Sequence, residues 1–105
     1  MTDKVVVLSN CASAEEAHRI ARHLVETRTA ACVNIIPGVR SIYRWKGAVE
    51  RDTERQVVMK TTRERVTALE SRLKQLHSYE LPEFLVLTAA GGGDQYLRWV
   101  AETVA

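Results

Sequence analysis

The residues that decide the fold are 31–60, with the sequence ACVNIIPGVRSIYRWKGAVERDTERQVVMK. Their first part, residues 31–36, is short, apolar and rich in β-branched side chains, which is typical of a strand. Pro37 removes a ladder donor, and Gly38 tolerates backbone angles that other residues avoid. The pair therefore predicts a bulge or kink inside a strand that continues beyond it.

The rest of this stretch completes a hairpin. Residues 41–46 alternate, so they send Tyr43 and Trp45 to one face of the strand. The polar residues 50–53 favour a chain reversal, and residues 55–60 are expected to return as the partner strand. We therefore predict one long β-hairpin between two helical regions.

The residues before the hairpin predict a strand followed by a helix. Residues 5–8 are uncharged and mostly β-branched, which indicates a strand buried on both faces. Ser13 lies three residues before Glu16, the spacing of a capping box, in which each side chain satisfies the other residue's free backbone N–H. Apolar residues then recur at helical spacing as far as Val25.

The residues after the hairpin repeat this arrangement. Thr61 and Glu64 are again three apart and predict the start of a second helix, whose apolar stripe ends at His77. Residues 84–87 predict a last buried strand, and Asp94 is expected to cap a short terminal helix. The predicted fold class is therefore α+β: a ferredoxin-like βαββαβ sandwich with an additional C-terminal helix.

Composition limits what the protein can be. The chain has 105 residues, 46% of them hydrophobic, and 15 Lys and Arg against 13 Asp and Glu, so we expect a single globular domain over residues 1–105. The near balance of charge argues against a nucleic-acid binder. No apolar stretch is long enough for membrane insertion, and no signal-peptide pattern opens the chain, so a cytoplasmic location is expected. Two cysteines are too few for a disulfide framework.

The predicted hairpin is longer than the layer that covers it. Arms of about 11 residues span roughly 36 Å at the usual strand rise. A helix of about 16 residues covers only some 24 Å. The overhanging part carries Tyr43 and Trp45, and an exposed aromatic ribbon with open edges associates unless another chain covers it. We therefore predict that the chain forms a homo-oligomer.

Polar side chains near the predicted strand ends are candidate metal ligands. His77 and Glu83, with a nearby thiol, can bind a divalent ion, since imidazole and thiolate suit copper or zinc. The alternative is structural, because a histidine at a helix C-terminus interacts favourably with the helix dipole. Cys32 with His77 could form a nucleophile pair, but an apolar strand raises the pKa of a thiol and makes it less reactive. No Ser/His/Asp arrangement is present, so we do not expect an enzyme.

A second group of candidates lies on the hairpin. Glu54 and Lys60 are six residues apart on the returning strand and are expected to face the same side, where they bind a charged ligand or pair with each other. Tyr43 and Trp45 either stack on a ligand or pack at a subunit contact.

Several separated motifs resemble the CutA family of divalent-cation tolerance proteins, in the right order and over nearly the whole chain. They are AACVNIIPG at 30–38, SIYRWKG at 41–47, Glu54, Lys60-Thr61, HSYELPE at 77–83 and YLRW at 96–99. The resemblance implies a ferredoxin-like subunit in a tight homotrimer similar to the PII signalling proteins. It also implies a link to copper and other divalent metals, cytoplasmic residence and no established catalytic reaction.

The resemblance also bears on the metal ligands. Where the family commonly has His-Pro-Tyr, this chain has His77-Ser78-Tyr79. The positions of a thiol and a second histidine found in some members hold Ser9 and Leu76. Of the family's ligands only His77 is unchanged, and the expected metal site is His77 with Cys32 and Glu83 as auxiliaries. Cys11 can substitute as a soft ligand if the turn brings it inward.

The predicted function is therefore binding of a divalent metal ion, copper(II), by a homotrimer that acts by sequestration or sensing. The alternative is a PII-like signalling trimer that holds a small anionic or nucleotide ligand in clefts between its subunits. The residues expected to line such an inter-subunit cleft are Tyr43, Trp45, Glu54, Lys60 and Tyr79.

Overall fold

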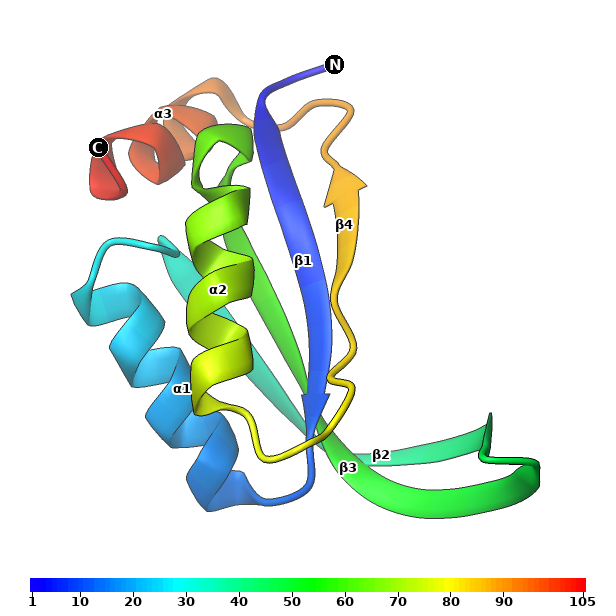
Figure 1. Cartoon of the computed structure of the whole chain (residues 1–105). Helices are drawn as coiled ribbons and strands as arrows, with labels where there is room; N and C mark the ends of the chain where they lie inside the picture. The colour runs from blue at the N-terminus through cyan, green and yellow to red at the C-terminus, as the bar shows by residue number, and fades with distance from the viewer.

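The computed structural model describes all residues 1–105 and contains one sheet of four strands. These are β1 (Lys4–Cys11), β2 (Cys32–Trp45), β3 (Ala48–Thr62) and β4 (Leu85–Thr88), in the spatial order β2-β3-β1-β4 (Figure 1). Each neighbouring pair is antiparallel. This order and the alternation with helices confirm the ferredoxin-like prediction.

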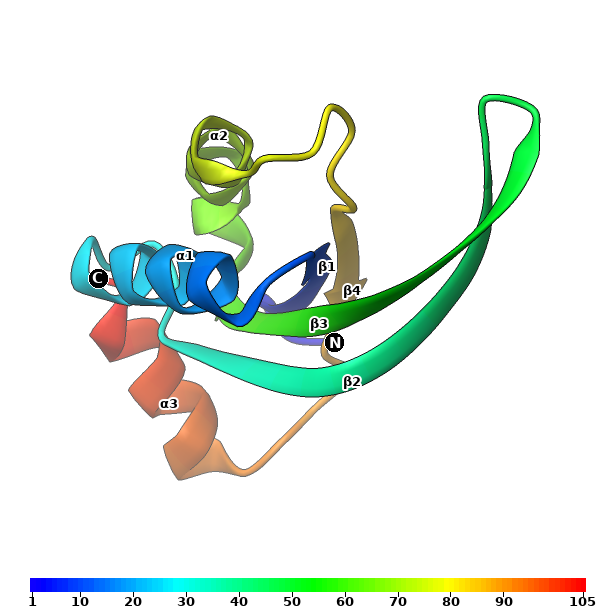
Figure 2. The ribbon, with the colours of Figure 1, turned by 90° about the horizontal axis from the view of Figure 1, so that it is seen from below.

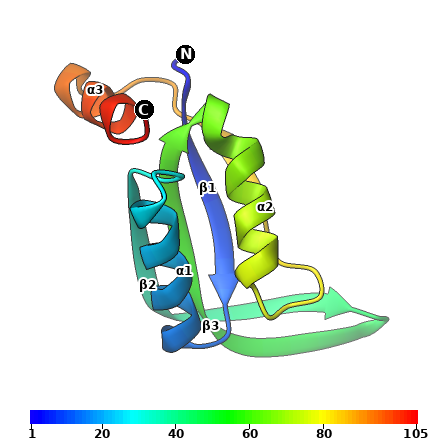
Figure 3. The ribbon, with the colours of Figure 1, turned by 60° about the vertical axis from the view of Figure 1, so that its left-hand side comes forward.

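Two helices, α1 (Ala14–Glu26) and α2 (Val66–Leu76), lie side by side on one face of the sheet (Figure 1). The third helix, α3 (Asp94–Thr103), lies at the end of the sheet where β1 begins (Figure 3). Val100 of this helix and Val104, its C-cap residue, pack against Ala31. The additional C-terminal helix is thus confirmed.

The core lies between the sheet and the two helices, so only one face of β1 is fully buried. Val5, Val7, Ser9 and Cys11 are buried and alternate with half-buried residues. They pack with apolar side chains of α1, α2 and β3, among them Ile20, Leu24, Met59, Leu69 and Leu73. The prediction that this strand is buried on both faces is wrong within the single chain, because the side chains on its other face are only half-buried.

The helix starts differ in part from the predicted capping boxes. Ser13 Oγ accepts a hydrogen bond from the Glu16 N–H at 3.1 Å, as predicted. The box at Thr61 and Glu64 is wrong: Thr61 belongs to β3, where its hydroxyl donates to the Thr29 carbonyl at 2.8 Å. A 3-10 turn, Arg63–Arg65, leads into α2 instead. Similarly, β4 begins one residue later than predicted, and Gly93, not Asp94, occupies the N-cap of α3.

The hairpin of β2 and β3 is longer than predicted and projects from the body beyond the end of β1 (Figure 2). Its register shifts between Ile36 and Val39, where Gly38 has φ +70°, so the predicted bulge is confirmed. The chain reverses at Lys46 and Gly47, with φ of 49° and 83°, and not at residues 50–53. Positive φ at both turn positions matches the right-handed twist of the two arms.

Candidate metal site

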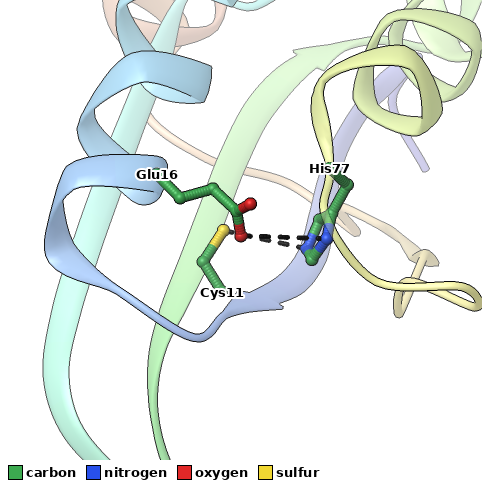
Figure 4. A group of neighbouring side chains, drawn as sticks. All are labelled: Cys11, Glu16 and His77. Carbon is green, nitrogen blue, oxygen red and sulfur yellow. Dashed lines mark hydrogen bonds and ion pairs between the residues drawn. The ribbon is translucent and has the colours of Figure 1, made fainter.

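Three side chains that can bind a metal meet where β1 ends. Cys11 is the last residue of β1, Glu16 lies in the first turn of α1, and His77 directly follows α2 (Figure 4). Their ligand atoms all lie within 4.8 Å of one another. The fold causes this convergence because β1 runs into α1 at the same end of the sheet at which α2 stops (Figure 1). We call this group the Cys11–Glu16–His77 triad.

Two backbone groups fix the ring of His77. Its Nε2 lies 2.6 Å from the Asn10 carbonyl oxygen, which can only accept, so Nε2 carries the proton and donates. Its Nδ1 accepts from the Tyr79 N–H at 3.1 Å. The side chain is fully buried, and its ring packs against Tyr79 with 4.7 Å between the ring centroids. In this geometry Nε2 is the donor of the ring and Nδ1 is its acceptor.

Glu16 uses one carboxylate oxygen and leaves the other free. Its Oε2 accepts from the Ser78 N–H at 3.0 Å. Its Oε1 is buried, accepts from no N–H or O–H group, and lies 3.9 Å from His77 Nδ1, with only the weak S–H donor of Cys11 nearby. Buried acceptors without a donor are uncommon in folded proteins, and a bound ion or water is one explanation for them. Arg19, at 3.8 Å from Oε2, is largely exposed and does not reach Oε1.

Cys11 supplies a fully buried thiol, with Sγ 3.8 Å from His77 Nε2. Burial raises the pKa of this thiol to about 12, and the negative charge of Glu16 adds to the shift. The thiol is therefore protonated at neutral pH, and a metal ion has to replace that proton. Sulfur, nitrogen and carboxylate oxygen together suit zinc and copper better than calcium or magnesium.

The predicted auxiliary ligands lie outside the triad. Cys32 is the first residue of β2, opposite Lys60 in the sheet register, and its thiol lies 3.8 Å from Asn34 Oδ1. Glu83 lies in the loop before β4, where it accepts a hydrogen bond from the Asn10 side-chain amide at 3.1 Å. The structure does bring Cys11 close to His77, which is the condition under which the sequence predicted Cys11 to replace the thiol ligand of other family members. Glu16 was missed as a ligand because its spacing from Ser13 indicated a cap.

Most of the predicted cleft residues line one cavity of about 870 Å³ between the hairpin and the loop that follows α2. Tyr43, Trp45, Glu54 and Tyr79 belong to it, whereas Lys60 does not. Glu54 is buried and accepts from the Tyr79 hydroxyl at 2.6 Å. Burial and this hydrogen bond raise the pKa of the Tyr79 hydroxyl above its usual range.

The charges of this cavity are mainly acidic. Three carboxylates, Glu54, Glu80 and Glu83, line it, against the single cation Arg40. Burial raises the pKa of Glu83 above its usual value, and the charge of Glu54 contributes. An anionic ligand would have to bind against this charge.

A family model for the CutA1 divalent ion tolerance protein matches residues 5–103 of the chain. The chain belongs to the CutA1 family. Its curated relatives include the divalent-cation tolerance protein CutA of Thermus thermophilus, which is 48% identical over 97 residues, covering 92% of this chain and 94% of that protein. They also include human protein CutA, 42% identical over 92 residues, of which the match spans 51%.

Solved CutA1 structures show the same fold. CutA from Xylella fastidiosa has a TM-score of 0.96 at 38% identity and covers 99% of this chain and 100% of its own. The Thermus thermophilus protein has a TM-score of 0.93 at 47% identity, over 95% of this chain and 97% of that one. The name of the Thermus thermophilus protein describes tolerance of divalent cations and no enzymatic activity.

The names of other CutA1 relatives refer to different compartments. The Arabidopsis thaliana relative is called chloroplastic, and the Archaeoglobus fulgidus structure is described as periplasmic. In the present chain none of the helices has the length and apolar character needed to cross a membrane.

Proposed function

We propose that this CutA1 protein binds a divalent metal ion at the Cys11–Glu16–His77 triad. The single observation that carries the proposal is the free Oε1 of Glu16, a buried acceptor without a donor that lies 3.9 Å from the imidazole of His77. Leaving such an oxygen unsatisfied costs about 1–3 kcal/mol. A cation beside Oε1 would offset that cost, and the neighbouring Cys11 and His77 supply further donors.

The ion we propose is copper(II), with zinc as the second ion that the same donors accept. Imidazole nitrogen favours both ions, and a thiolate adds affinity for borderline and soft metals. The names of the relatives, which refer to divalent-cation tolerance, support a role in metal handling. The protein would act by sequestration or sensing and not by catalysis, because the three donors are largely buried, the Cys11 thiol is protonated, and the neighbouring Nε2 of His77 carries a proton and cannot serve as its base.

We also propose that the working unit is a homotrimer. Leu85 and Leu87 of β4 and Ile36 of β2 are exposed apolar side chains, and both strands are sheet edges. The projecting hairpin adds exposed Ile42 and Tyr43. Exposed apolar strands with open edges are covered by another chain in stable proteins. Sedimentation equilibrium should give three times the 11.8-kDa chain mass, and a monomer at micromolar concentration would contradict the trimer.

The metal proposal is tested by competition titrations of zinc(II) and copper(II) under anaerobic conditions. Cys11→Ala, Glu16→Gln and His77→Ala should each weaken zinc binding at least tenfold, whereas Cys32→Ala and Glu83→Gln serve as matched controls and should bind as the unmodified protein does. Equal affinity in His77→Ala and the unmodified protein would reject the triad. Loss of binding in the Cys32 and Glu83 variants alone would move the site to the ligand set predicted from sequence.

No observation favours the signalling alternative with an anionic ligand, because the cavity between hairpin and loop is lined mainly by carboxylates. We retain the cytoplasm as the proposed compartment, since both cysteines are free thiols and a reducing compartment keeps them so. Fractionation of cells that express the tagged full chain would check this location.

A further inference from the structure

The hydrogen bonds of His77 decide which of its nitrogens is available to a metal ion. The Nε2–H group donates a hydrogen bond to the Asn10 carbonyl oxygen at 2.6 Å, and this oxygen can only accept. Nδ1 has a lone pair, which accepts from the Tyr79 N–H at 3.1 Å. Coordination through Nε2 would require Nδ1 to carry the proton, and that proton would then point at the Tyr79 N–H, another donor.

Coordination through Nδ1 avoids this conflict. Nε2–H keeps its bond to the Asn10 carbonyl, the kind of outer contact that commonly orients a metal-binding histidine. Nδ1 is also the nitrogen that lies 3.9 Å from the free Oε1 of Glu16. Two ligands at about 2.0–2.2 Å from a tetrahedral ion are separated by about 3.4 Å, so a small approach of these two atoms suffices. The one bond lost is that of the Tyr79 amide.

Tyr79 links the triad to the hairpin. Its N–H is bonded to His77, while its hydroxyl donates to Oε2 of Glu54, a buried residue of β3. Tyr79 and Glu54 both line the cavity beneath the hairpin. The hydroxyl bond therefore holds Tyr79 in the position in which its amide occupies Nδ1.

We infer that His77 coordinates the ion through Nδ1 and that the Tyr79 N–H thereby loses its hydrogen bond to the ring. Metal occupancy is in this way coupled to the hydrogen bond between Tyr79 and Glu54 on the hairpin. This inference rests on the proposed metal site and specifies how occupancy of that site is transmitted to the surface of the protein. The coupling is reciprocal: whatever loosens the contact with Glu54 strengthens metal binding by the same factor.

Reciprocity predicts a gain of affinity from a loss of a hydrogen bond. Tyr79→Phe removes the hydroxyl that donates to Glu54 and leaves all three triad side chains in place. We expect the variant to bind zinc about fivefold more tightly, which corresponds to about 1 kcal/mol of this hydrogen bond opposing metal binding. The matched control is Tyr43→Phe, since the Tyr43 hydroxyl donates to Asp52 on the hairpin and has no bond to the triad.

The experiment measures zinc affinity by competition titration for the unmodified protein, Tyr79→Phe and Tyr43→Phe, and follows the Tyr79 amide by ¹⁵N-labelled NMR. We expect tighter binding in Tyr79→Phe only, a zinc-dependent shift and faster hydrogen exchange of the Tyr79 amide, and histidine ¹⁵N signals that place zinc on Nδ1. Unchanged affinity in Tyr79→Phe, or zinc on Nε2, would overturn the inference while the metal site stands. Zinc binding that survives Glu16→Gln and His77→Ala would overturn both.

Discussion

Replacing Glu16 by Gln should make the metal-free protein more stable while it weakens metal binding. Glu16 Oε2 accepts from the Ser78 N–H, and a glutamine oxygen can keep this bond. The free Oε1 would become an NH₂ group 3.9 Å from His77 Nδ1, whose lone pair this group would share with the Tyr79 N–H. The substitution therefore exchanges an unsatisfied buried acceptor for a donor that has a partner within reach.

The size of the effect follows from three contributions. Satisfying the buried atom returns about 1–3 kcal/mol. Losing the ion pair with the exposed Arg19, at 3.8 Å, costs about 0–1 kcal/mol. Losing a negative charge in the first turn of α1 costs about 0.3–1 kcal/mol. The net gain is about 1 kcal/mol per chain, which raises the Tm by about 4–8 °C for a domain of this size.

Thermal unfolding followed by circular dichroism, at one protein concentration and with a chelator present, measures this difference. Zinc added at about 100 times its Kd for the unmodified protein should then stabilise that protein by about 2.7 kcal/mol, and Glu16→Gln, which binds at least tenfold more weakly, by about 1.4 kcal/mol or less. Glu15→Gln is the matched control, because Glu15 is exposed in the same helical turn. A Tm of Glu16→Gln that is below that of the control would refute the reasoning, since the carboxylate would then support the metal-free fold.

Three further predictions concern the thiols and the hairpin. In the native protein a thiol reagent such as Ellman's reagent should label Cys32 and spare Cys11, because Cys11 is fully buried and its thiol stays protonated; labelling of both at equal rates would contradict this. The pKa of Cys11 is raised from 9.0 to about 12 in the folded protein, so its contribution to stability is intact below pH 9. Between pH 9 and pH 12 the free energy of unfolding should fall by about 1.4 kcal/mol per pH unit. Urea titrations at several pH values measure this slope, which should be missing in Cys11→Ala. Gly47→Ala should lower the free energy of unfolding by about 1 kcal/mol, because alanine is strained at φ +83°, whereas Gly91→Ala, at a residue without positive φ and with open space around it, should not.

The sequence predicts the topology well and the hairpin turn poorly, for reasons that lie in its residues. Alternation and helical spacing are local signals, so strands and helices could be placed within a few residues. The reversal was expected at the polar residues 50–53, but these form an exposed arm of β3, where polar side chains are equally at home. The actual turn has Lys46 at a position where Asn or Asp is the usual signal.

The metal site could be predicted only in part. His77 was identified from its place after a helix, and Cys11 only as a conditional substitute. Cys11 and His77 are 66 residues apart, and nothing in their spacing shows that β1 and α2 end at the same edge of the body. Cys32 was expected only as an auxiliary ligand beside His77, and its position opposite Lys60 in β2 separates it from the triad.

Glu16 shows how a local rule and a distant contact compete for one side chain. In a capping box its carboxylate would turn back to the Ser13 N–H, a donor three residues away that ordering of the helix already brings close. It reaches instead to Ser78, 62 residues along the chain, and leaves Oε1 buried without a donor. In the metal-free fold the bond to Ser78 replaces the bond to Ser13, but the burial of Oε1 has no visible compensation. Departures of this kind concentrate at functional sites, because selection retains them for what the site binds. The compensation for Glu16 is therefore to be sought in the ion that Cys11, Glu16 and His77 can hold together.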